Sequence, residues 1–571
     1  MDEEVNRDKA PRAEHPDSSS PPSLVLDNKI TGVVESPVSV SANKDLAMVD
    51  AEDAPTVQHM SITSSAALDV AGNKYLDKKS EQAPFEKLPN ELRHIIIGYI
   101  GINKSLYNAV RVNKAWFDSL IDHIWYDAGV NALSSVCEEG GRRQFYASKI
   151  KDFGKDFYGY DLQTLRSVRL PSLHTLSLSN LEGCVDGALL CSLLTPTLRS
   201  IKLADCEFGR SELEAFGACT LLRKISLEYA KVPSMEGLIA CLNQLQYLQI
   251  VEFKGEISTH DNSSDHRGEL YPWLLQNSNL KEISLGTVYP MLLDHLTQVP
   301  QENDREVLAH RPNLNALGVH GPRQTILPLL SIATETLKRL DLAGNGPGDL
   351  PHDICNSLMQ FPNLVELRLT LNDGCSMSTA EMGSISSLTR LKVLEMRSGR
   401  SGNNCMNLNW FTDDLFEIWI CNLPNICELS LEWKCDALTE RVIGSLGRSC
   451  PKLEKCRLLW THDLNLWRTG LKTPLFPTLK RLELGEISPL IGSIPSSPNV
   501  HNAAHYLKYL MELAPSLEAY DIMGSNFEPS GDAVWLCEAF ENAAGGYYDD
   551  GEAKLSKELV QAYLDGLEAS T

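Results

Sequence analysis

The feature that most constrains this chain is a leucine pattern, L-x-x-L-x-L, which recurs thirteen times between residues 170 and 523. Units from the start, middle and end of this stretch are Leu173/Leu176/Leu178, Leu245/Leu248/Ile250, Leu364/Leu367/Leu369 and Leu517/Tyr520/Ile522. The mean step is about 29 residues, and periods of roughly 20 to 50 residues are typical of solenoids. The pattern therefore predicts one elongated array of repeats and excludes a set of separate globular domains over this stretch.

Each unit has the properties of a strand followed by a turn and a helix. Residues two apart in a strand point to the same side, so the second and third leucines of a unit point into the core together. Apolar residues at helical spacing follow many of the strands, in residues 187–194, 211–219, 235–242, 326–333, 415–423, 440–447 and 504–513. Neighbouring strands lie ~4.8 Å apart and packed helices ~8 to 10 Å apart, so the stacked units must bend with their strands inside the curve.

This pattern resembles the leucine-rich-repeat family. The family's fuller signature, L-x-x-L-x-L-x-x-N/C-x-L, is present in three units, in which Cys206, Asn345 and Asn372 occupy the N/C position. The resemblance implies an α/β fold, a horseshoe-shaped solenoid with parallel strands on its concave face and helices outside.

A second motif lies in residues 85–129. The residues that carry it are Leu88, Pro89, Glu91, Leu92, Ile96, Leu106, Val112, Lys114, Trp116, Leu120, Ile124 and Trp125. In this order and spacing they resemble the F-box, a small module of three helices. Ile97 replaces the usual Phe and Asn113 a frequent Cys, and both changes leave the helical pattern intact. Leu92, Ile96 and Ile100 form one apolar stripe of a helix.

The F-box resemblance implies docking on the Skp-type adaptor of a cullin-RING ubiquitin ligase. The adaptor-binding residues would be Leu88, Pro89, Glu91, Leu92, Ile96, Ile100, Leu106, Val112, Trp116 and Leu120. Three short helices bury too little surface to be stable alone, so their apolar stripes must dock on a partner, on the repeats, or on both. The alternative is that these helices only cap the open end of the solenoid, which repeat proteins commonly need.

The outward positions of the strands are strongly charged in the middle and late repeats. We expect a protein substrate to bind there, and the candidate residues are Arg339, Arg368, Arg397, Trp433, Arg457, Trp460 and Arg481. Arginine offers bidentate contacts and exposed tryptophan is a frequent anchor of interfaces. The alternative is that an exposed sheet face is simply polar, with charges of opposite sign paired between neighbouring strands.

The sequence offers no enzyme chemistry. It contains no P-loop, no G-x-S-x-G, no H-E-x-x-H, no EF-hand loop and no C-x-x-C pair, and its 14 histidines lack metal-ligand spacing. Cysteines in the predicted helices, Cys191, Cys219, Cys241 and Cys450, are expected to be small core residues. We therefore expect a protein that is not an enzyme and needs no metal or cofactor.

Charge and composition limit the partners and the compartment. A net charge of −23 argues against nucleic acid and against an anionic membrane surface as partners. The first residues are acidic rather than basic and apolar, and no apolar run is long enough to span a bilayer. We expect the chain to be cytoplasmic, nuclear or both.

Together these features predict five segments and a function. The segments are a disordered acidic tail rich in Ser and Pro (1–84), the F-box-like module (85–129), a helical connector (130–169), the solenoid (170–540) and an acidic tail with a terminal helix (541–571). The predicted function is substrate recognition for a Skp-cullin-F-box ubiquitin ligase, and the alternative is a scaffold protein without a ligase.

Overall fold

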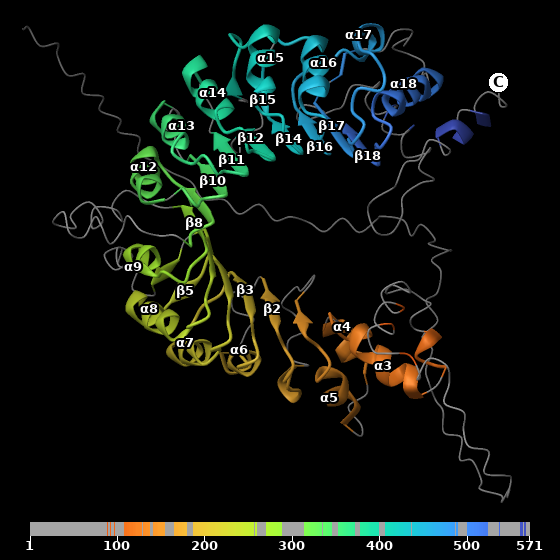
Figure 1. Cartoon of the computed structure of the whole chain (residues 1–571). Coiled ribbons are helices and arrows are strands. Elements are labelled where there is room, and N and C mark those ends of the chain that lie inside the picture. Colours follow the sequence, from red (N-terminus) through yellow and green to blue (C-terminus); the bar gives the residue numbers. More distant parts are fainter. Residues whose placement is uncertain are drawn as a thin grey trace, which may run out of the picture. The chain divides into compact units, whose positions relative to one another are not determined.

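The structure is a computed structural model of the chain (Figure 1). It describes residues 88, 92, 96, 108–112, 114–127, 130–136, 141–154, 165–179, 187–255, 257–259, 270–287, 313–333, 335–344, 352–371, 377–398, 406–435, 437–485, 487–488, 500–522, 536, 539, 560–563 and 565–566. Contacts divide the chain into residues 1–81 and 82–571, and every described residue belongs to the second unit. The predicted tail of residues 1–84 lies outside the described residues.

Fourteen described strands form one sheet in which every neighbouring pair is parallel (Figure 1). In spatial order they are β1 (Asp152–Phe153), β2 (Thr175–Leu178), β3 (Ser200–Ala204), β4 (Lys224–Glu228), β6 (Ile250–Lys254), β8 (Glu282–Thr287), β9 (Ala316–His320), β10 (Arg339–Ala343), β11 (Glu366–Leu371), β12 (Val393–Ser398), β14 (Glu428–Leu431), β16 (Lys455–Leu458), β17 (Arg481–Leu484) and β18 (Ala519–Ile522). Spatial order equals chain order, as in a solenoid in which each unit stacks on the one before it.

Two short parallel pairs supplement the main sheet: β5 (Lys231–Val232) with β7 (Ser258–Thr259), and β13 (Met406–Asn407) with β15 (Trp433–Lys434). The described helices are α3 (Lys114–Ile124), α4 (Val130–Ser134), α5 (Arg142–Ala147), α6 (Gly187–Leu193), α7 (Arg210–Gly217), α8 (Met235–Gln244), α9 (Leu270–Gln276), α12 (Arg323–Ile332), α13 (His352–Leu358), α14 (Thr379–Ser386), α15 (Asp413–Cys421), α16 (Glu440–Ser449), α17 (Leu464–Gly470) and α18 (Val500–Leu513). Helices α6 to α18 line one face of the sheet (Figure 1). The repeated strand-turn-helix unit makes this fold a leucine-rich-repeat solenoid.

The core lies between the sheet and the helices, and the leucine pattern supplies it. At each strand the two inward residues pair in register with those of the next strand, for example Leu367 with Leu340 on one side and Leu394 on the other. All three side chains are fully buried. Full burial of a leucine side chain stabilises the fold by about 1.5 to 3 kcal/mol. Each repeat adds leucines to the same continuous core, so each adds a similar amount of stability. The strand and helix predictions for this region are confirmed.

One strand differs from its predicted register, and the short strands β1, β5, β7, β13 and β15 were not predicted. The pattern placed Leu248 and Ile250 inward, but β6 begins at Ile250, and its inward residues are Val251 and Phe253. Leu248 instead takes the position before the strand that the first leucine has in other units. The segment 130–169, predicted to be a helical connector, also contains β1, which pairs with β2 and begins the sheet.

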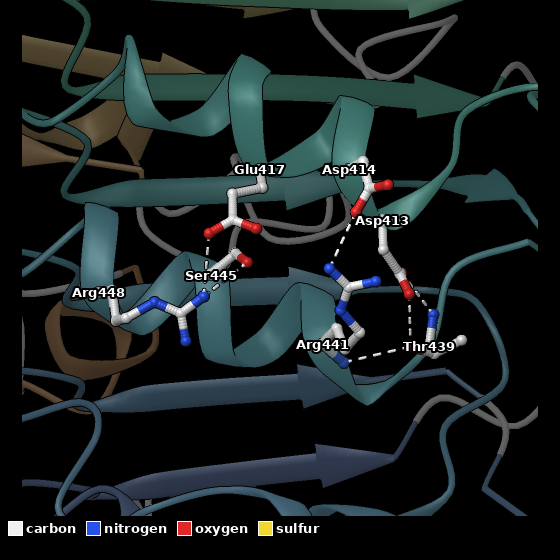
Figure 2. A network of polar contacts seen from close by, with 7 residues as sticks. All are labelled: Asp413, Asp414, Glu417, Thr439, Arg441, Ser445 and Arg448. Atoms are coloured by element: carbon white, nitrogen blue, oxygen red, sulfur yellow. Dashed lines mark hydrogen bonds and ion pairs between the residues drawn. The ribbon is translucent and has the colours of Figure 1, made fainter.

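Polar contacts join successive helices on their outer side (Figure 2). Asp413 at the start of α15 accepts hydrogen bonds from the backbone N–H and the hydroxyl of Thr439, at 2.8 Å and 2.6 Å. Thr439 in turn caps α16 by accepting from the backbone N–H of Arg441. A helix N-terminus has unsatisfied N–H groups that such caps satisfy, so this network fixes the position of α16 against α15.

Candidate protein-interaction surfaces

The first candidate surface is the side of the sheet that faces away from the helices. We call it the exposed sheet face, made by the outward residues of β8 to β17. Glu395 on β12 lies at its centre between two arginines: its carboxylate is 3.1 Å from Nε of Arg368 on β11, and it also pairs with Arg397 on its own strand. Glu395 retains only 13% side-chain exposure, and the arginines retain 41% and 50%.

A second charge cluster follows on β16 and β17. Arg457 contacts Glu432 at 3.0 Å and Glu483 at 3.5 Å, and Arg481 contacts Glu483 at 2.7 Å. Burial raises the pKa of the Glu432 carboxyl, and the positive charges of Arg457 and Arg397 oppose this effect only in part. The predicted arginines thus lie on one face, as expected, but each is paired with glutamate.

Arg339 crosses a neighbouring strand to find its partner. Its guanidinium on β10 lies 2.7 Å from the carboxylate of Glu282 on β8, although β9 runs between the two strands. The residues of β9 at this place are Ala316 and Gly318, whose small size leaves room for the arginine to pass. A Cβ added at Gly318 would lie 2.9 Å from the Ser284 hydroxyl oxygen, so a larger residue there would displace Ser284 on β8.

The exposed sheet face is hollowed between β9 and β17, with a volume of about 570 Å³. Its lining includes His320, Asp341, Thr370 and Ser430 together with the paired arginines. Burial raises the pKa of the Asp341 carboxyl, and the charges of His320 and Arg368 oppose the effect. Sequence reasoning did not select His320 or Ser430 as site residues, although strand alternation places both on this face. Its described lining is rich in charged and polar side chains, so the hollow can receive polar groups.

The prediction of exposed anchors at Trp433 and Trp460 is wrong. The exposed fractions of these side chains are 0% and 5%, and their rings stack with centroids 6.2 Å apart inside the core. The reason is strand alternation: Trp433 is two residues after the inward Leu431, and Trp460 is two after the inward Leu458, so both continue the inward side. Their cluster includes Phe411.

The cysteines predicted to be core residues are buried at Cys219, Cys241 and Cys450, and Cys191 is half-buried. Burial raises the pKa of each of the three buried thiols to about 12. Because the thiolate is the nucleophile, these positions are poorly suited to thiol chemistry. Within the described part of the chain, no group of three or more His, Cys, Asp or Glu side chains is arranged to hold a metal ion. The described helices include none that is both long and apolar enough to cross a membrane.

The second candidate surface is the F-box-like segment. Leu92 is 46% exposed, Val112 is 66% exposed, and Leu88 and Ile96 are half-buried. The other predicted adaptor-binding residues outside α3 lie beyond the described residues, namely Pro89, Glu91, Ile100 and Leu106. Large apolar side chains with this exposure are available to a partner.

Helix α3 contributes a small core of its own. Leu120 is fully buried, and Trp116 and Ile124 pack against it in a cluster separate from the core of the repeats. Leu120 was predicted to contact the adaptor, and that prediction is wrong for direct contact because no surface of this side chain is accessible. Its role is to hold the helices together, and Trp116 is half-buried at its side.

The end of α3 is joined to the first repeat. The Trp125 and Tyr146 rings stack with centroids 4.5 Å apart. The backbone carbonyl of Tyr126 accepts hydrogen bonds from the N–H groups of Lys151 and Asp152, at 3.0 Å and 2.8 Å. These contacts tie the residues that follow α3 to β1 and α5.

Comparison with known proteins identifies no family for this chain. No protein-family model matches the sequence, and no curated protein matches it. Similar solved structures include the yeast Rad7 and Elc1 complex, at 16% identity, covering 77% of this chain and 96% of that chain with a TM-score of 0.38. An internalin of Listeria monocytogenes covers 62% of this chain and 87% of its own length, at 12% identity and a TM-score of 0.29. A leucine-rich-repeat protein of Leptospira interrogans covers 61% and 90%, at 16% identity and a TM-score of 0.29.

Proposed function

We propose that this chain is the substrate-recognition subunit of a cullin-RING ubiquitin ligase of the Skp-cullin-F-box type. The observation that carries the proposal is the F-box-like motif together with the exposure of Leu92, which is 46% accessible. A side chain whose only role was to seal the solenoid would be buried against it. The F-box-like helices bind the Skp-type adaptor, and through it the cullin.

In this proposal the solenoid holds a protein substrate and the chain makes no covalent bond itself. Ubiquitin transfer belongs to the RING subunit and its conjugating enzyme, and this chain supplies proximity and orientation. The exposed sheet face suits such a role because its arginines are held in place by ion pairs with nearby glutamates. Ordered side chains lose less conformational freedom on binding than mobile ones do.

A second function has an observation in its favour. The stacking of Trp125 on Tyr146 and the hydrogen bonds of Tyr126 to β1 are contacts that a solenoid cap makes. In a scaffold protein without a ligase, the helices would serve only to cap the solenoid through these contacts. The two roles use different residues, since capping uses the end of α3 and adaptor binding uses Leu88, Leu92 and Ile96.

Substitution at Leu92 tests the proposal. We expect Leu92→Ala in the full chain to weaken binding of the purified Skp-type adaptor by about 2 kcal/mol, roughly thirtyfold, because a central apolar contact is lost. The matched control is Leu466→Ala on α17, since Leu466 is 47% exposed but lies on the repeats. Titration calorimetry measures both affinities. The proposal fails if the wild-type chain, shown to be folded by circular dichroism, does not bind the adaptor.

A further inference from the structure

Two surfaces of the solenoid neutralise their own cations. On the exposed sheet face the arginines pair with glutamates, as described above. On the outer helices, Figure 2 shows Arg441 pairing with Asp414 at 2.9 Å and Arg448 pairing with Glu417 at 3.1 Å. A cation that already faces a carboxylate has little charge to offer to an anionic partner.

The edge of the sheet where the chain enters the strands is different. Lys338 precedes β10 and Lys392 precedes β12, and both side chains are exposed. Their backbones are fixed, because the N–H of Lys338 donates to the Asn315 carbonyl and that of Lys392 to the Val365 carbonyl, each at 2.8 Å. Neither ammonium group has a carboxylate partner within the described part of the chain. The same place in earlier repeats is also basic, at Arg199, Arg223 and Lys281.

Asparagines, not carboxylates, hold two more cations at this edge. The Asn363 side-chain amide donates to the Glu335 carbonyl at 2.9 Å, and its oxygen accepts from the Arg390 guanidinium. Asn425 repeats the arrangement two units further along the chain, before β14: its amide donates to the Thr389 carbonyl at 3.1 Å. An amide oxygen orients a cation without cancelling its charge, since the amide group is neutral.

Asn425 orients Lys452, whose ammonium group lies 2.9 Å from the amide oxygen. We define Lys338, Arg390, Lys392 and Lys452 as the basic rim. Lys338, Arg390 and Lys392 line a hollow of about 650 Å³ together with Asn315, Asn363 and Asn425, and no Asp or Glu is among its described lining residues. Further along this edge the pattern changes: the residue before β16 is Glu454, and it pairs with Lys480, the residue before β17, at 2.8 Å.

We propose that the basic rim binds an acidic segment of a partner protein in an extended conformation. The positive charges of the rim are arranged in a line and complement a line of carboxylates. Lys338 and Lys392 enter strands two spacings apart, or ~9.6 Å, and further cations follow along the same edge. An extended peptide presents alternate side chains on one side every ~6.6 Å, so successive Asp or Glu residues can each reach a cation. A linear array suits such a segment better than a single compact anion.

The inference rests on the proposed function in naming the substrate class, because a receptor of this kind would capture proteins that display such a segment. Binding at the rim and binding of the adaptor use different residues, so the two proposals can fail separately. Each variant below is therefore also tested for adaptor binding, which we expect to be unchanged.

The test uses the full chain and a fluorescein-labelled peptide of alternating Glu and Ser, with an alternating Gln and Ser peptide as reference. We expect Lys338→Ala with Lys392→Ala to weaken binding of the Glu peptide by about tenfold or more in fluorescence anisotropy. The matched control is Lys202→Ala with Lys254→Ala, which removes the same charge from outward positions of β3 and β6. The control should change affinity by less than about twofold.

A second variant tests the role of the amides. Asn363→Asp places a carboxylate beside Arg390 and removes the amide donor to the Glu335 carbonyl. We therefore expect weaker peptide binding together with a somewhat lower melting temperature. Unchanged peptide binding by the folded variant would contradict the role of the amide. If the rim and control variants lost the same affinity for the Glu peptide, the proposal would be overturned, because the binding would then reflect non-specific electrostatic attraction. Binding of a phosphoserine peptide with no binding of the Glu peptide would overturn it too, as would failure of the wild-type chain to bind the Glu peptide at low ionic strength.

Discussion

Replacing Trp433 by alanine is expected to lower the free energy of unfolding by about 3 to 5 kcal/mol, the range found when a large buried aromatic side chain is deleted. Trp433 has no exposed surface, and its ring contacts Phe411, Trp419 and Trp460. Deleting it would open a cavity that these rigid rings cannot fill. Urea denaturation followed by circular dichroism measures the loss.

Two variants control this prediction. Ile418→Ala removes an apolar side chain that is 65% exposed on α15, and should change stability by less than about 0.5 kcal/mol. Trp433→Phe should cost less than Trp433→Ala, because phenylalanine fills part of the space that alanine leaves empty. An exposed anchor would behave differently: Trp433→Ala would leave stability unchanged and reduce partner binding.

The second large effect is a loss of stability in acid that depends on His462. This side chain is buried between Trp460 and Trp467, with ring centroids 5.2 Å and 5.3 Å away, and one ring nitrogen is hydrogen-bonded to the Leu458 carbonyl at 3.1 Å. Burial lowers the pKa of His462 to about 4, although the hydrogen bond to Leu458 opposes the effect. In the unfolded chain the pKa is about 6.5.

Between these two values the unfolded state binds a proton that the folded state does not. The free energy of unfolding therefore falls as the pH drops from about 6.5 to about 4, by roughly 1.4 kcal/mol per unit and about 3 kcal/mol in all. Above pH 6.5 the contribution is constant. We expect the stability difference between wild type and His462→Phe to change by this amount between pH 7 and pH 4.

The control for this experiment is Trp460→Phe, which disturbs the same cluster but keeps the imidazole buried. Its stability curve should run below the wild-type curve and parallel to it. Parallel curves for wild type and His462→Phe would mean that His462 takes up its proton without unfolding, and would contradict the account.

The sequence predicted most strands and core residues of the solenoid because the same L-x-x-L-x-L pattern recurs in every repeat. Leucines at fixed spacing are both the pattern and the core, so burial of Leu340, Leu367 and Leu394 follows from alternation alone. The pattern failed at β6, where Leu245, Leu248 and Ile250 satisfy the same spacing three residues too early. A local pattern cannot distinguish two such registers, which only pairing with β4 and β8 selects.

The candidate surfaces were less predictable. The outward arginines lie on the predicted face, but some of their partners come from other strands, as with Arg339 and Glu282 across β9. Sequence does not show such a contact, because it depends on the small side chains of Ala316 and Gly318 lying between them. The asparagines that hold Arg390 and Lys452 are similarly visible only when successive repeats are stacked.

The most direct test of the central claim is assembly of the ligase core. The full chain is mixed with purified Skp-type adaptor and cullin-RING, and the masses of the separated species are measured by size-exclusion chromatography with light scattering. The account predicts one particle that contains one copy of each component, and its loss when Leu88→Ala and Leu92→Ala are combined. Elution of a folded wild-type chain by itself, apart from an adaptor-cullin complex, would contradict it.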